Sequence, residues 1–167
     1  MDYCALARES LTTWLREDRL LSRAERAGFR AGCFVSLHDG PGQLRGCVGT
    51  IEPVKEDLVV EIIQNAVSAG TRDPRFAPVS PEELAGLVFE VSVLHPPEPV
   101  SGPEFLDPKR YGIVVTQGWR RGVLLPDLEG IDSVARQLSI TKQKAGIYND
   151  DPVELERFEV EKYHESD

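Results

Sequence analysis

The stretch with the most chemical potential is Leu44-Arg45-Gly46-Cys47-Val48-Gly49-Thr50. If it forms a strand, alternation places Arg45, Cys47 and Gly49 on one face, with Arg45 and Cys47 about 7 Å apart. A guanidinium this close lowers the pKa of a thiol and favours the thiolate. Glycines weaken strands, so this pair indicates close approach by a ligand or another backbone segment. Cys47 is therefore either a nucleophile beside Arg45 or a small buried hydrophobic residue.

Other polar residues could complete such a site. A catalytic cysteine needs a base, and His38, at the end of the neighbouring strand, is the best placed of the three histidines. Asp73 and Arg75 form either a pair that anchors its own loop or a carboxylate and guanidinium that face a cleft. Glu90 lies among apolar residues of a strand. If buried, it must pair with a cation such as Arg45 or Arg75, and otherwise it is solvated.

The elements that must position these residues are helices and hairpins in turn. We expect a helix from Tyr3 that ends before Gly28, a hairpin over 32–51, a helix over 58–70, a short helix opened by a Ser80–Glu83 capping box, a strand over 87–94, a loop over 95–110, strands over 111–116 and 123–125, a helix over 131–146, and an edge strand over 153–163. This order lacks regular β-α-β units, so it favours an α+β fold with a mostly antiparallel sheet and flanking helices.

Composition excludes several classes of function. The 167 residues include 19 basic and 28 acidic ones, a formal charge of −9, which disfavours nucleic acids and anionic membranes as partners. Trp119-Arg120-Arg121 is the one compact basic candidate, and we expect it at a hairpin tip. Three cysteines without a CxxC motif, and histidines without metal-ligand spacing, predict no metal site. No membrane-length apolar run or signal peptide is present, so we expect a cytoplasmic protein.

The motifs also resemble those of a known family. The stretch 44–50 is similar to the LRGCIGT signature of the AMMECR domain family. Later blocks of the chain are similar to those of the family in the same order: Asp73-Pro74-Arg75-Phe76, Pro78, Glu83-Leu84, Glu90-Val91-Ser92-Val93-Leu94, Tyr111-Gly112-Ile113, Gly122-Val123-Leu124-Leu125-Pro126 and Lys144-Ala145-Gly146. The resemblance covers nearly the whole chain.

This resemblance implies a single AMMECR-type domain over residues 1–167, α+β, with two unequal subdomains and a groove between them. The larger subdomain would come from both chain ends and the smaller from the middle, roughly residues 55–100. Prokaryotic members of the family often accompany a Memo-type protein, which is similar to extradiol dioxygenases, and a radical-SAM protein. The resemblance therefore implies a shared pathway with these two, and it identifies no cofactor.

Two functions follow as hypotheses. In one, the chain is an enzyme or enzyme component that acts on a small anionic molecule. Cys47 and Arg45 would then be catalytic, and the ligand would meet the following residues: Gly46, Gly49, Thr50, Asp73, Arg75 and Glu90. In the other, the chain is a non-enzymatic partner of a Memo-like protein. Either function is compatible with a monomer or a homodimer.

Overall fold

A computed structural model describes residues 1–165, which form two compact units. The first unit is Met1–Leu94 together with the C-terminal segment from Glu161, and the second is His95–Val160. These bounds differ from the expected middle subdomain of roughly residues 55–100. The reason is that the helix over residues 58–71 packs on the N-terminal sheet and shares one hydrophobic core with it.

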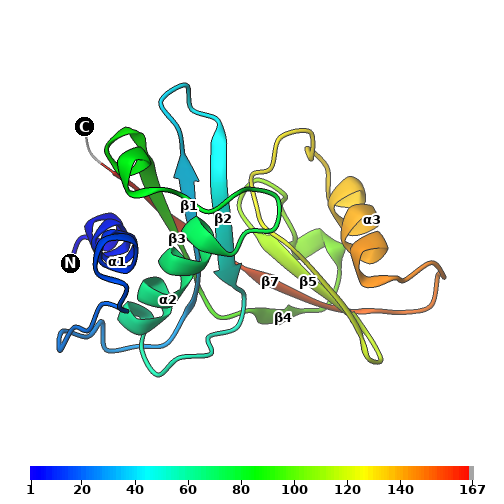
Figure 1. The fold of residues 1–167 in the computed structure, drawn as a ribbon. Coiled ribbons are helices and arrows are strands. Elements are labelled where there is room, and N and C mark those ends of the chain that lie inside the picture. The colour runs from blue at the N-terminus through cyan, green and yellow to red at the C-terminus, as the bar shows by residue number, and fades with distance from the viewer. Residues whose placement is uncertain (166–167) are drawn as a thin grey trace. The chain divides into compact units, whose positions relative to one another are not determined.

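The first unit consists of one antiparallel-paired sheet and two α-helices (Figure 1). Its elements are α1 (Tyr3–Glu17), β1 (Gly32–His38), β2 (Leu44–Thr50), α2 (Leu58–Thr71), the short 3-10 helix η1 (Pro81–Gly86), β3 (Val88–Leu94) and β8 (Val160–His164). The strand order is β2-β1-β3-β8. Strand alternation turns Cys33, Val35 and Leu37 of β1 toward α1 and α2, where all three are fully buried.

Local sequence explains where the helices of this unit begin and end. Asp57 caps α2 by accepting hydrogen bonds from the backbone N–H groups of Val59, Ala27 and Gly28. Burial alone would raise the pKa of Asp57, but these three donors hold it below its ordinary value. The first helix ends before Gly28, as predicted, because the left-handed backbone of Asp18 ends it after Glu17.

The second unit has its own sheet, with one α-helix packed against it. Its elements are β4 (Glu98–Val100), the 3-10 helix η2 (Pro103–Phe105), β5 (Gly112–Gln117), β6 (Arg120–Leu124), α3 (Val134–Ala145) and β7 (Glu154–Phe158), with strand order β4-β7-β5-β6. The expected hairpin tip is confirmed, because Trp119 lies in the tight turn between β5 and β6. Its side chain is 87% exposed.

Two predictions for this region need correction. The proline-rich stretch 95–110 is not all loop, because β4 lies within it and pairs with β7. The segment 153–163 is not one edge strand. Its first half, β7, lies inside the second sheet between β4 and β5, and its second half, β8, is an edge of the first sheet. Local alternation cannot show that consecutive strands pair in different sheets.

The fold class is α+β, as predicted, with two four-stranded sheets in place of one. Within residues 1–165, no helix is both long and apolar enough to cross a membrane.

Candidate functional site

Cys47 lies on β2, an edge strand of the first sheet, and is the only one of the three cysteines that is not buried. Its register partner on β1 is Ser36, whose hydroxyl donates a hydrogen bond to Cys47 Sγ over 3.2 Å. Ser36 is also the register partner of Glu90 on β3. Because residues in register share a face, the three side chains form one polar row across the sheet, on the face opposite Cys33, Val35 and Leu37 of β1.

The two glycines of β2 fit tightly against neighbouring groups. A Cβ on Gly46 would lie 2.2 Å from the carbonyl oxygen of Ala69 in α2, and one on Gly49 would lie 2.3 Å from Cγ of Phe34. Both positions therefore need glycine so that a helix backbone and an aromatic ring can approach the strand. The space gained by omitting the side chains is filled by the protein itself.

Thr50 belongs to a buried polar network on the helix side of the sheet. Its hydroxyl donates to Glu61 Oε2 over 2.9 Å and accepts from Asn65 Nδ2 over 3.2 Å. Glu61 is only 1% exposed, and its other oxygen accepts the backbone N–H groups of Val54 and Lys55. Thr50 thus holds the end of β2 to α2 and faces away from the polar row that contains Cys47.

Arg45 braces the loop that runs along the edge of β2. Its guanidinium donates to both carboxylate oxygens of Glu83, over 3.1 and 3.3 Å, and to the carbonyl oxygens of Ala77 and Pro78. The Glu83 carboxylate also accepts the Ser80 N–H, as the capping box predicts. The N–H of Ser80 and the Arg45 guanidinium hold the pKa of Glu83 below its ordinary value. Most donors of Arg45 are therefore engaged in the fold.

Asp73 connects this loop directly to the candidate nucleophile. Its Oδ2 accepts the backbone N–H of Cys47 over 3.0 Å, so it satisfies a donor of the edge strand that no neighbouring strand could pair. The same carboxylate binds the Arg75 guanidinium through Nε and Nη2, over 3.1 and 2.8 Å. Asp73 is 5% exposed. The side-chain hydrogen bonds from Arg75, together with backbone donors, hold the pKa of Asp73 well below its usual range.

Arg75 is linked to Cys47 through Asp73, whose carboxylate accepts from both the Cys47 N–H and the Arg75 guanidinium. The hydrogen bonds to Asp73 raise the pKa of Arg75 above its ordinary value. The Arg75 side chain is 55% exposed, and its guanidinium lies 5.3 Å from the ring centroid of Phe76. Held by a buried carboxylate yet open to solvent, this guanidinium can bind an anion.

Glu90 has different partners from those considered from the sequence. Its carboxylate lies 4.0 Å from His38 Nδ1 and 3.6 Å from His164 Nδ1, and the side chain is 21% exposed. Neither Arg45 nor Arg75 is its ion-pair partner. His38 is opposite Leu44 in the hairpin register, whereas Cys47 is opposite Ser36. The polar neighbour of the thiol is thus a serine, and the expected histidine lies beside the glutamate.

The candidate site therefore unites Cys47, Ser36, Asp73, Arg75 and Glu90, and excludes the Thr50 side chain. Sequence reasoning missed Ser36 and His164. The register of the hairpin over 32–51 would have revealed Ser36, whereas His164 is distant in the chain and no local pattern points to it. Within the described part of the chain, no group of three or more His, Cys, Asp or Glu side chains is arranged to hold a metal ion.

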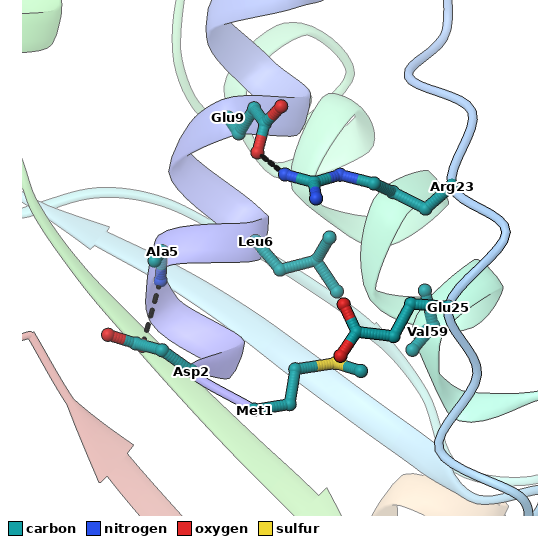
Figure 2. A pocket seen from close by; sticks show the side chains of 8 residues that line it. All are labelled: Met1, Asp2, Ala5, Leu6, Glu9, Arg23, Glu25 and Val59. Carbon is teal, nitrogen blue, oxygen red and sulfur yellow. Dashed lines mark hydrogen bonds and ion pairs between the residues drawn. The ribbon is translucent and has the colours of Figure 1, made fainter.

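A separate cavity of about 220 Å³ lies between α1, the segment that follows it and the start of α2 (Figure 2). Ala5, Leu6 and Val59 form its apolar side. Glu9 and Arg23, which also line the cavity, form an ion pair with each other. Further carboxylates, Asp2 and Glu25, give the wall more acidic than basic groups. This cavity contains none of the residues predicted from the sequence, and its charge does not suit an anionic ligand.

Comparison with known proteins identifies the family of this chain. The AMMECR1 family profile matches residues 4–164. The chain belongs to the AMMECR1 family. A protein of Thermotoga maritima is 58% identical over 135 residues, which are 80% of this chain and 78% of the relative. The AMMECR1-family chain is also similar to the crystal structure of an uncharacterized protein from Pyrococcus horikoshii. The TM-score is 0.83 at 31% identity, over 98% of this chain and 89% of the other.

Some relatives are longer than this AMMECR1-family chain. A protein of Clostridium acetobutylicum is 44% identical over 170 residues, which cover 98% of this chain and 36% of the relative. The chain thus spans about a third of the length of that protein.

Asp73 gives the first testable prediction. Replacing Asp73 with Asn leaves the Cys47 N–H and the Arg75 guanidinium with a weaker partner, so we expect the free energy of unfolding at pH 7 to fall by about 2–4 kcal/mol. The carboxyl pKa is lower in the folded state than the value of about 3.9 in the unfolded chain. Its stabilisation is therefore complete above about pH 5 and is lost as the pH falls through 4 and below.

Urea denaturation of wild type and Asp73→Asn across this pH range measures both effects. The variant should lose stability less steeply toward low pH than wild type. Asp150→Asn, an exposed aspartate in the second unit, is the control and should follow wild type. Parallel pH profiles for wild type and Asp73→Asn would show that the carboxylate contributes nothing to the acid sensitivity.

Proposed function

We propose that the chain is an enzyme, or a component of one, that acts on a small anionic molecule, with Cys47 as the nucleophile and Arg75 as the group that binds the anion. The observation that carries this proposal is the hydrogen-bonded arrangement around one accessible thiol. Ser36 donates to the sulfur, and Asp73 holds both the Cys47 backbone and the Arg75 guanidinium. The thiolate is the reactive form of cysteine and must reach its substrate, and of the three cysteines Cys47 is the one that is not buried.

The roles of the remaining residues differ from those first considered. Arg45 supports the loop that carries Arg75, since its guanidinium is held by Glu83 and two carbonyl oxygens. Glu90 lies on the same sheet face as Cys47, and its carboxylate is close to His38 and His164. In this proposal, Glu90 is the group that gives a proton to the bound molecule or takes one from it. This division of roles leaves the substrate to be recognised by Arg75 and attacked by Cys47.

Thiol modification tests the role of Cys47. With iodoacetamide at neutral pH, we expect one of the three cysteines of the folded protein to react, because burial raises the pKa of Cys4 to about 11 and that of Cys33 to about 12. The Cys47→Ser variant should then show no rapid labelling, whereas Cys4→Ala should label as wild type does. Mass spectrometry of the labelled peptides identifies the site. A Cys47 that stays unmodified until the protein unfolds would overturn the nucleophile role.

The charge of the reagent tests the role of Arg75. The same thiolate attacks the CH₂ carbon of iodoacetate and of iodoacetamide and displaces iodide. The ratio of the iodoacetate rate to the iodoacetamide rate therefore removes the effect of the thiol pKa and reports the local potential. Arg75→Gln should lower this ratio about three- to ten-fold, because the proposal makes this guanidinium the cation that attracts the anionic reagent to the thiolate. Arg72→Gln, an exposed change of equal charge in the same loop, should alter it by less than about two-fold. Equal ratios in wild type and Arg75→Gln would exclude anion recognition by Arg75.

A second candidate function, partner of a Memo-like protein, has one specific observation in its favour. Trp119 is 87% exposed at the hairpin tip, with the Arg120 guanidinium 5.1 Å from its ring centroid. Trp and Arg are the residue types that dominate binding energy at protein interfaces. An exposed tryptophan on a tight turn therefore suits contact with another protein.

A binding assay with the Memo-type protein from the same organism tests this candidate. We expect wild type to bind and Trp119→Ala to bind at least ten-fold more weakly, as is common for a truncated interface tryptophan. Phe29→Ala, which removes another exposed aromatic side chain, is the control and should bind like wild type. If wild type forms no complex, or if Trp119→Ala binds equally well, this candidate is excluded.

A further inference from the structure

The second unit contains a cavity of about 340 Å³ that no role described above uses. Its lining comes from the start of the second unit, the turn before β5 and the end of β7: His95, Pro96, Glu98, Arg110, Tyr111, Arg157, Phe158 and Glu159. Phe158 is 2% exposed and Tyr111 is 9% exposed, so two well-buried aromatic residues line the cavity. Two arginines, Arg110 and Arg157, also line it.

Both guanidiniums contact the same aromatic ring. That of Arg157 lies 4.3 Å from the ring centroid of Tyr111, and that of Arg110 lies 4.9 Å from it. Stacking on an aromatic ring fixes the plane of a guanidinium and reduces the entropy lost when it binds a ligand. The buried amide of Gln137 donates to the Tyr111 carbonyl oxygen and so holds this residue from the side of α3.

Glutamates orient the two arginines but leave donors available. Arg157 donates through Nε to Glu98 over 2.7 Å and through Nη1 to the Phe105 carbonyl oxygen over 2.8 Å. Arg110 donates through Nε and Nη2 to one oxygen of Glu159. Among residues 1–165, no acceptor is bonded to Arg157 Nη2, Arg110 Nη1 or the Tyr111 hydroxyl. Each arginine therefore keeps an unpaired terminal nitrogen.

The depth of the charged groups decides which ligand suits the cavity. The Arg157 side chain is 25% exposed, whereas Glu98 is 59% and Glu159 is 48% exposed. The carboxylates are thus better solvated, and the most deeply placed charge is a guanidinium. Arg157, Arg110 and Tyr111 all line the cavity and each keeps a donor, so these three residues are the ones that a small oxyanion would meet, with Arg157 the less exposed of the two arginines. Two arginines that present planar donors are typical of phosphate and carboxylate recognition.

We propose that this cavity is an oxyanion-binding site of the second unit, which takes a small organic molecule through its phosphate or carboxylate group. The glutamates compete for the same guanidiniums and lower the net positive charge, so the isolated oxyanion binds weakly, with a Kd in the millimolar range. The remaining cavity volume accommodates the organic part of the ligand against Tyr111 and Phe158. This proposal does not depend on the role of Cys47.

A two-dimensional ¹⁵N–¹H NMR titration tests the proposal with inorganic phosphate and, separately, with acetate. Chloride at equal ionic strength is the reference in both. We expect saturable shifts confined to the amides around Arg110, Tyr111 and Arg157, up to about 50 mM ligand, where a millimolar site is filled. Binding of phosphate alone, acetate alone or both supports the proposal and identifies the preferred group. No saturable shift with either anion would overturn it.

Variants separate this site from general charge effects. Arg157→Gln should weaken binding at least about ten-fold, because the deepest charged donor is lost. Arg136→Gln, an equal change of charge on the exposed side of α3, should leave the Kd within about two-fold. Because Arg157 also holds Glu98 and Phe105, Tyr111→Phe provides a variant that keeps the ring and removes only its hydroxyl. It should weaken binding about three- to ten-fold. Unchanged affinity in both Arg157→Gln and Tyr111→Phe would overturn the proposal.

Discussion

The buried carboxylate of Asp73 is the interaction on which the candidate site depends. An edge strand leaves backbone donors unpaired, and Asp73 satisfies the one at Cys47 while holding the guanidinium of Arg75. The same group thus completes the sheet edge and fixes the position of Arg75 relative to the Cys47 backbone. Since an unpaired buried carboxylate is costly, Asp73, Arg75 and the Cys47 backbone stabilise one another as a unit.

Arg45 and Arg75 are both candidates from the sequence, but they have different roles because their side chains are exposed to different extents. Arg45 has a side chain that is 19% exposed and most of its donors committed to Glu83 and the loop carbonyls, so it supports the loop. Arg75 is 55% exposed and is held by one carboxylate, so it retains donors for a ligand. The arginine close to the cysteine in the sequence is structural, and the one that is distant in the sequence is linked to the Cys47 backbone through Asp73.

The two units present anion-binding chemistry in different ways. In the first unit, a half-exposed guanidinium is linked through Asp73 to the backbone of a partly exposed cysteine. In the second, two guanidiniums contact the ring of Tyr111 in the lining of a cavity. The first arrangement suits reaction at an anionic molecule and the second suits retention of one. The chain has a formal charge of −9, so these arginines form local positive sites in an acidic protein. Such local sites favour small anions over extended polyanions.

The sequence by itself determined the α+β class, the hairpin over 32–51, the helix over 58–70 and the family, because hydrophobic periodicity, turn residues and motif order are local properties. It also identified Cys47, Asp73 and Arg75 as residues to consider. Only the tertiary structure decided their partners: Ser36 for the thiol, Asp73 for the Cys47 backbone, and His38 with His164 for Glu90. The physical reason is that strand register and loop packing bring together residues far apart in the chain, such as Glu90 and His164, which are 74 positions apart, and no local pattern encodes these contacts.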